Sequence, residues 1–157
     1  MTAFFWIRVA TVLGFLAVAA GAFGAHGLRT SLKAELAAEA IAAAQEKAGG
    51  AAEAEPEPVR RVLASRRLEV FDTGVKYHFW HCLALFGLGL LMLQTGRSGV
   101  AERVAGVGFL VGTLIFSGGL YALALTGIPA LGMIPVLGGI AFMVGWVGLF
   151  LAARPCG

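Results

Sequence analysis

Charged side chains are scarce in this sequence. Only 13% of its 157 residues are Asp, Glu, Lys or Arg, whereas 59% are hydrophobic and 23 residues are glycine. A soluble domain of this length has too small an interior to bury so large an apolar fraction. The scarcity of charge therefore excludes an ordinary soluble domain and indicates a protein that has the lipid bilayer as its solvent.

Cysteines and catalytic motifs are also few. The two cysteines, Cys82 and Cys156, are expected on opposite sides of a hydrocarbon layer about 30 Å thick, so they cannot form a disulfide with each other. The chain has no G-x-S-x-G elbow, no G-x-x-x-x-G-K-[ST] loop and no pair of carboxylates within its apolar runs. Its net charge of +3 comes without the basic face and aromatic platforms of a nucleic-acid-binding surface. We therefore expect neither an enzyme nor a nucleic-acid-binding protein.

Four long apolar runs account for most of the chain. They extend over about 4–25, 77–93, 104–125 and 131–153. Each approaches the roughly 20 residues that a helix needs to cross the hydrocarbon core. The short connections "QTGRSGVAER" and "TGIPALG" carry glycine and proline turn signals and predict antiparallel hairpins. The sequence thus predicts an all-α fold, an integral membrane four-helix bundle with both termini on one side.

A long polar stretch, residues 29–70, separates the first two apolar runs and is expected to be an extramembrane insertion. Its first half, "SLKAELAAEAIAAAQEKA", consists mainly of strong helix formers and predicts a helix. The segment "GGAAEAEPEP" at 49–58 predicts a linker. From Val59 onward an irregular amphipathic pattern predicts a helix that lies on the membrane or on the protein before it turns into the second span.

Basic residues are distributed unevenly between the two sides of the predicted bundle. The side with the long loop carries eight Lys and Arg residues, and the side with the termini carries four. Cytoplasmic loops of membrane proteins carry an excess of Lys and Arg. We therefore expect the long loop in the cytoplasm and both termini outside.

Three histidines lie at the loop-side ends of the first two spans. His26 follows the first apolar run, whereas His78 and His81 begin the second and project from one side of a helix. Tyr77 and Tyr121 are expected at the same membrane face. Two interpretations stay open: these five residues form a site for metal, haem, quinone or lipid, or the imidazoles cap helix ends, bond to backbone or contact head groups. Three imidazoles suffice for a zinc site, but the H-x-x-H spacing lacks the glutamate of H-E-x-x-H, and the sequence assigns no cofactor.

Small residues recur at every fourth position in three of the runs. This spacing lets helix backbones approach closely within lipid, where no hydrophobic force drives helices together. We expect these residues to mark helix-packing seams. They are Ala17, Gly21 and Ala25 in the first run, Gly108 and Gly112 in the third, and Ala141 and Gly145 in the fourth.

Three blocks of sequence resemble one known family. The blocks are "GAFGAHGL" at 21–28, "FDTGVKYHFWHCLAL" at 71–85 and "FSGGLYALALTGIPALGMIPVLGGIAFMVGWVGLFLAA" at 116–153. In this order they resemble the family called domain of unknown function 423, the YgdD-like small inner-membrane proteins. The resemblance covers all four spans and implies a multi-pass protein of the cell inner (plasma) membrane with no settled activity. Members of that family usually join the first two blocks by a short linker, so the insertion at 29–70 is a departure from the pattern.

These observations together predict a structural or accessory role. We expect a subunit of a larger membrane protein assembly that is surrounded by membrane lipids and contacts a membrane protein partner through the 29–70 insertion. The first alternative is a protein with the histidine-lined binding site described above. The second is a small channel or transporter, for which Arg8, Thr113 and Ser117 offer little polarity within the spans.

Overall fold

The computed structural model describes residues 1–49 and 57–154, and within them all regular elements are helices. Helix α1 (Ala3–Phe23) continues through a π-helical turn (Gly24–Leu28) into α2 (Arg29–Gly49), and α3 covers Glu57–Thr95. Helix α4 (Val100–Gly112) continues through a second π-helical turn (Thr113–Ser117) into α5 (Gly118–Thr126). A 3-10 turn (Pro129–Met133) then leads into α6 (Ile134–Ala152). Most of the predicted linker and Cys156 lie outside the described residues.

Four helical stretches of the described chain are long and apolar enough to cross a membrane. They cover Ala3–Ala42, Arg61–Thr95, Val100–Thr126 and Pro129–Ala152. At roughly 1.5 Å per residue, even the shortest exceeds the roughly 30 Å of a hydrocarbon core. The expected all-α bundle of four membrane helices, with a further helix between the first and second, is thus confirmed.

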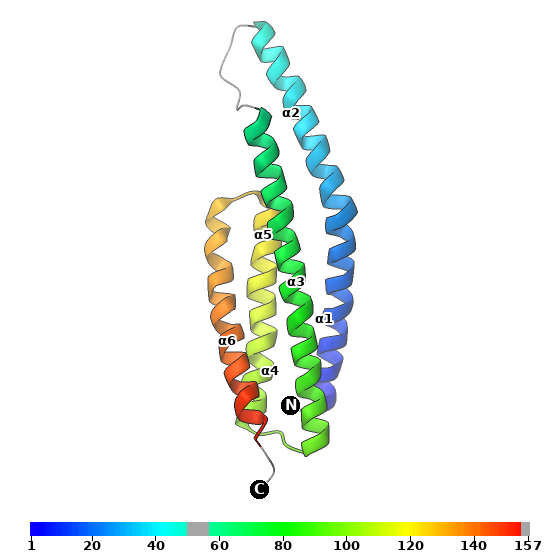
Figure 1. The fold of residues 1–157 in the computed structure, drawn as a ribbon, viewed down its shortest axis with the longest axis vertical. Coiled ribbons are helices and arrows are strands. Elements are labelled where there is room, and N and C mark those ends of the chain that lie inside the picture. The colour runs from blue at the N-terminus through cyan, green and yellow to red at the C-terminus, as the bar shows by residue number, and fades with distance from the viewer. Residues whose placement is uncertain (50–56, 155–157) are drawn as a thin grey trace.

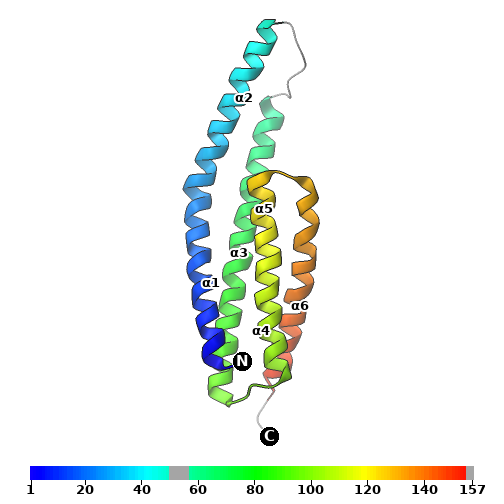
Figure 2. The same cartoon turned by 180° about the vertical axis from the view of Figure 1, so that it is seen from behind.

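Helix α3 is the central element of the bundle (Figures 1 and 2). It packs against α1 on one side and against α4 and α5 on the other, and α6 packs against α4. Both termini lie at the same end of the bundle as the connection between α3 and α4. At the opposite end, α2 and the first turns of α3 extend past the connection between α5 and α6.

Helix α3 runs without interruption through the place where the sequence predicted a change of direction. The amphipathic segment that begins at Val59 does not turn into the second span but continues in the same helix to Thr95. An apolar cluster explains this course, because Phe71 of α3 packs with Leu28, Leu32 and Ala124 from the neighbouring helices. The segment therefore lies beside α2 and runs parallel to the long axis of the bundle (Figure 1).

Glycines form the contact between α4 and α6. A Cβ atom added to Gly108 would lie 2.7 Å from the Cα atom of Gly145 and 2.9 Å from the carbonyl oxygen of Ala141. A Cβ atom on Gly148 would lie 2.6 Å from the backbone nitrogen of Ala105. The two backbones are thus in direct contact, which is the packing that small residues permit in lipid.

The first span presents its small residues differently at its two ends. Ala17 is buried, and a Cβ atom on Gly21 would meet Val75 at 3.4 Å, whereas Ala25 is exposed. Ala25 lies in the π-helical turn, and Gly24, one residue earlier, faces the ring of Phe71. The turn explains the difference, because the wider π turn rotates the following residues away from the face that four-residue spacing follows in an α-helix.

Candidate functional site

Two of the predicted site residues, His78 of α3 and Tyr121 of α5, form a hydrogen-bonded pair inside the bundle. His78 Nδ1 and the hydroxyl oxygen of Tyr121 are 3.1 Å apart. The His78 side chain is buried, and its second nitrogen, Nε2, has no partner in the part of the chain that the structure describes. His78 therefore has one imidazole nitrogen that is buried and makes no hydrogen bond within the described chain.

His81, one helical turn further along α3, uses both of its nitrogens within the protein. Its Nδ1–H donates to the Tyr77 carbonyl oxygen at 2.8 Å, and its Nε2 accepts from Trp146 Nε1 of α6 at 3.3 Å. A carbonyl can only accept and an indole N–H can only donate, so this geometry fixes a neutral imidazole with its proton on Nδ1. His81 also stacks on Phe142, with ring centroids 3.4 Å apart. Its role in this arrangement is to link α3 to α6.

Aromatic side chains surround these histidines and line a groove between α3 and α6. The groove has a volume of about 760 Å³, and its walls include Tyr77, Trp80, His81, Phe142 and Trp146. The Tyr77 ring lies against Phe116, with ring centroids 4.7 Å apart. Such a surface suits a flat apolar molecule more than a charged one.

His26 does not join the other two histidines. It is exposed in the first π-helical turn, where its Nδ1 lies 3.3 Å from the carbonyl oxygen of Ala22. Among residues 1–49 and 57–154, no three His, Cys, Asp or Glu side chains form a group that could hold a metal ion. The structure thus brings His78 and Tyr121 together, and His81 with Tyr77, but it does not assemble a three-histidine centre.

The pairing of His78 with Tyr121 predicts a measurable contribution to stability. Changing Tyr121→Phe removes the hydroxyl and leaves a buried imidazole with neither nitrogen bonded, which should lower the free energy of unfolding by about 1 kcal/mol. The matched change Tyr77→Phe removes a hydroxyl that has no hydrogen bond within the described chain and should alter it by less than about 0.5 kcal/mol. Thermal melting of both variants in detergent checks the difference. Equal melting temperatures would show that the hydrogen bond contributes nothing.

At the end of the bundle opposite the termini, Arg67 of α3 joins three helices. Its Nε and Nη2 donate to the carbonyl oxygens of Ala124 and Leu125, both at 2.8 Å, where α5 ends. Its Nη1 lies 3.1 Å from a carboxylate oxygen of Glu35 on α2. A cation at the C-terminal end of a helix satisfies free carbonyl groups and interacts favourably with the helix dipole. Arg67 therefore marks the level at which the bundle ends.

Beyond this level α2 and α3 form what we call the stalk, residues 36–49 and 57–66. At roughly 1.5 Å per residue, the two helices extend about 20 Å and about 15 Å past the bundle. Apolar side chains on the stalk are exposed: Val62 by 63%, Leu63 by 47% and Val59 by 41%. Their spacing places these three residues on one face of α3.

A groove of about 560 Å³ lies at the base of the stalk, between α2, α3 and the end of α5. Leu32, Leu36, Leu63 and Val70 contribute apolar walls. Acidic residues of α2 and basic residues of α3 also line it, namely Glu35, Glu39, Arg66 and Arg67. The exposed apolar face of α3 thus leads into a groove with charges of both signs.

Comparison with known proteins identifies the family. The family model described as "Protein of unknown function (DUF423)" matches residues 20–139. The chain belongs to this family. DUF423 members that it resembles include the UPF0382 membrane protein YwdK of Bacillus subtilis, with 32% identity over 148 residues that cover 94% of each chain. The UPF0382 inner membrane protein YgdD of Escherichia coli is 30% identical over 153 residues, which cover 98% of this chain and 92% of the relative.

No solved structure matches the chain. The names of the relatives describe membrane proteins and state no activity. Together with the four helices of membrane-crossing length, they indicate a small multi-pass membrane protein and add no reaction. The matched segment includes all five predicted site residues and ends before Trp146.

Sequence reasoning missed several residues that organise this DUF423 protein. The sequence gives no sign that Trp146 is the partner of His81 or that Arg67 joins three helices. Trp6 is fully buried, and a Cβ atom on Gly106 would overlap its indole ring. The sequence could not predict this contact, because Trp6 and Gly106 lie in separate apolar runs and meet only through the way the helices are rotated against one another.

Proposed function

We propose that this membrane protein is a non-catalytic accessory subunit of a larger membrane protein assembly and that the stalk binds its partner. The observation that carries the proposal is the apolar face formed by Val59, Val62 and Leu63 on α3, which projects with α2 beyond the bundle (Figure 1). Single apolar residues on a surface are ordinary, but a row of them next to a groove is typical of a helix-binding site.

The partner that fits this surface is an amphipathic helix of another membrane protein. Its apolar side chains would cover Val62 and Leu63, and its charged side chains would pair with Glu39 and Arg66 at the edge of the groove. Interfaces of this kind draw their affinity from a few central apolar contacts and their orientation from charges at the rim. The non-catalytic part of the proposal is supported by His81, whose two nitrogens are both bonded within the bundle.

The location that we propose is the inner, or plasma, membrane, with the stalk in the cytoplasm and both termini outside. The support is the distribution of Lys and Arg, eight of which lie on the side of the stalk and four on the side of the termini. The similar Escherichia coli protein is named an inner membrane protein.

The test compares stalk variants in protein purified gently from native membranes. The double substitution Val62→Ser with Leu63→Ser should lower the amount of a stoichiometric co-purifying membrane protein at least about tenfold, because central apolar contacts dominate such interfaces. The control is Ala37→Ser with Ala38→Ser, which alters exposed residues of α2 and should leave the partner bound. Quantitative mass spectrometry supplies the readout, and thermal melting checks that both variants keep a folded bundle. Unchanged co-purification of every protein with the Val62 and Leu63 variant would contradict the proposal.

A second candidate function is binding of a flat apolar molecule such as a quinone. The observation that favours it is the aromatic groove lined by Tyr77, Trp80 and His81. The same purified sample distinguishes the two functions, since a bound quinone or haem would appear in its absorption spectrum or in an organic extract.

A further inference from the structure

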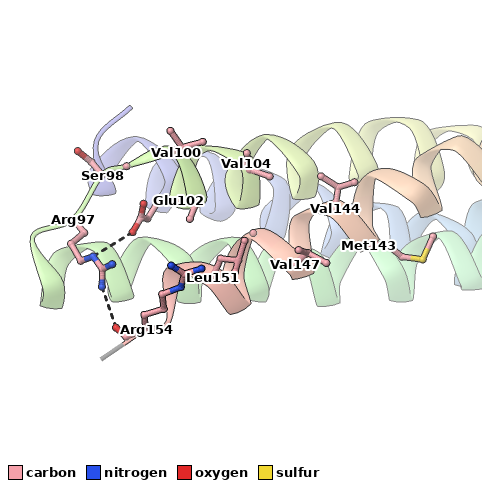
Figure 3. Close-up of a pocket in the computed structure, with 13 residues that line it drawn as sticks. Arg97, Ser98, Val100, Glu102, Val104, Met143, Val144, Val147, Leu151 and Arg154 are labelled. Carbon is pink, nitrogen blue, oxygen red and sulfur yellow. Dashed lines mark hydrogen bonds and ion pairs between the residues drawn. The ribbon is translucent and has the colours of Figure 1, made fainter. Parts of the chain in front are cut away.

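A third groove lies between α4 and α6, at the end of the molecule opposite the stalk (Figure 3). It has a volume of about 740 Å³. Arg97 and Arg154 lie at one end of it and Met143 lies towards the other. We propose that this groove binds one glycerophospholipid of the surrounding leaflet, with the lipid phosphate at Arg154 and one acyl chain between the two helices.

The polar end of the groove is built around Arg97. Its Nη1 donates to the carbonyl oxygen of Arg154 at 3.1 Å, and its Nε lies 4.0 Å from a carboxylate oxygen of Glu102. Glu102 is only 4% exposed, so its charge is compensated chiefly by Arg97. These contacts hold the α3–α4 connection against the end of α6.

Arg154 is the second positively charged side chain at the polar end of the groove. Its guanidinium makes no hydrogen bond or ion pair with the part of the chain that the structure describes, and it is exposed at the groove. With Glu102 balanced by Arg97, the polar end keeps one positive charge. Arginine binds phosphate oxygens through paired N–H groups, so a lipid phosphate complements this charge.

The apolar part of the groove has the dimensions of one acyl chain. Val104 of α4 and Val144, Val147 and Leu151 of α6 line it. Gly148 lies between these side chains and in contact with α4, so the floor of the groove carries no side chain at that point. From Arg154 to Met143, α6 rises roughly 16 Å, which is about half of a 30 Å hydrocarbon core and therefore the depth of one leaflet. A charge at the membrane edge with an apolar channel of this depth matches a phospholipid better than a water-soluble anion.

The test is native mass spectrometry of the full-length protein in detergent, supplied with equal amounts of phosphatidylglycerol and phosphatidylcholine. We expect one retained phospholipid per chain, with phosphatidylglycerol preferred because its net negative charge is not offset by a choline group. Changing Arg154→Gln should reduce that retention about tenfold. The control Arg103→Gln removes an exposed arginine near the same end of α4 that does not line the groove, and it should have no effect.

A second variant tests the acyl-chain part of the groove independently. Changing Val147→Trp places a large ring in an exposed position of the groove and should abolish retention of both lipids without disturbing the buried seam. Equal losses in the Arg154 and Arg103 variants would show a general surface charge effect and overturn the proposal. A lipid-free dimer that dissociates in the Val147 variant would also overturn it, since a second copy of the chain would then occupy the groove.

Discussion

Replacing Gly108 with alanine should lower the free energy of unfolding by about 2–3 kcal/mol, because overpacking a tight contact forces backbones apart. The new methyl group would lie 2.7 Å from both the nitrogen and the Cα atom of Gly145. Neither atom belongs to a side chain that can rotate away, so α4 and α6 must separate. Separation would weaken the contact along its length, including the one between Gly148 and Ala105.

The control for this prediction is Gly87→Ala in α3. Gly87 is exposed, and an added Cβ atom meets nothing within 4 Å. Alanine is favoured over glycine within a helix by roughly 0.5–1 kcal/mol, so this variant should be as stable as the parent or slightly more stable. Reversible unfolding in mixed detergent micelles measures both changes. If Gly108→Ala unfolds at the same denaturant fraction as Gly87→Ala, the backbone contact between α4 and α6 does not exist as described.

Replacing Arg67 with glutamine should cost about 2 kcal/mol and loosen the end of α5, since a hydrogen bond that involves a charged group contributes about 1.5–3 kcal/mol net of its exchange with water and glutamine keeps part of this donor capacity. Two such bonds reach the carbonyl oxygens of Ala124 and Leu125. The pair with Glu35 adds little, because half of the Glu35 side chain is exposed and solvent screens the charges. The larger part of the effect should therefore appear at α5 rather than at α2.

The neighbouring Arg66→Gln variant is the matched control, because Arg66 is exposed and lies one residue away on the same helix. Hydrogen exchange followed by mass spectrometry resolves the place of the effect. In the Arg67 variant we expect faster exchange over residues 118–133, and in the Arg66 variant we expect the parent pattern. Faster exchange confined to α2, with residues 118–133 unchanged, would show that Arg67 stabilises only its contact with α2 and would contradict this prediction.

The helices of this protein could be predicted from the sequence for a simple physical reason. A segment in lipid must satisfy its backbone hydrogen bonds internally, so a long apolar run has little choice but to be helical. The four apolar runs therefore predicted the positions of the spans, and the Ala-rich composition of 31–48 predicted helix α2. The continuity of α3 was not predicted, because the cluster of Phe71 with Leu28 and Ala124 depends on helices that are distant in sequence.

The candidate site was predictable only in part. His78 and His81 are three residues apart at the start of the second apolar run. The sequence could therefore predict that both lie on one side of a helix at the loop side of the membrane. Their partners could not be predicted, because Tyr121 and Trp146 lie on helices whose rotation is set by packing rather than by local sequence. The position of Ala25 shows the same limit, since a π-helical turn changes the face of a residue without any change in composition.

The measurement that tests the central claim most directly is photo-crosslinking from the stalk in living cells. A photoreactive amino acid is placed at Val59, Val62 or Leu63, and at Ser65 on another face of the same helix. If the stalk binds a partner, the three apolar positions should all crosslink to the same membrane protein, and Ser65 should give little product. Equal crosslinking from all four positions, or crosslinking only to lipid, would contradict the account.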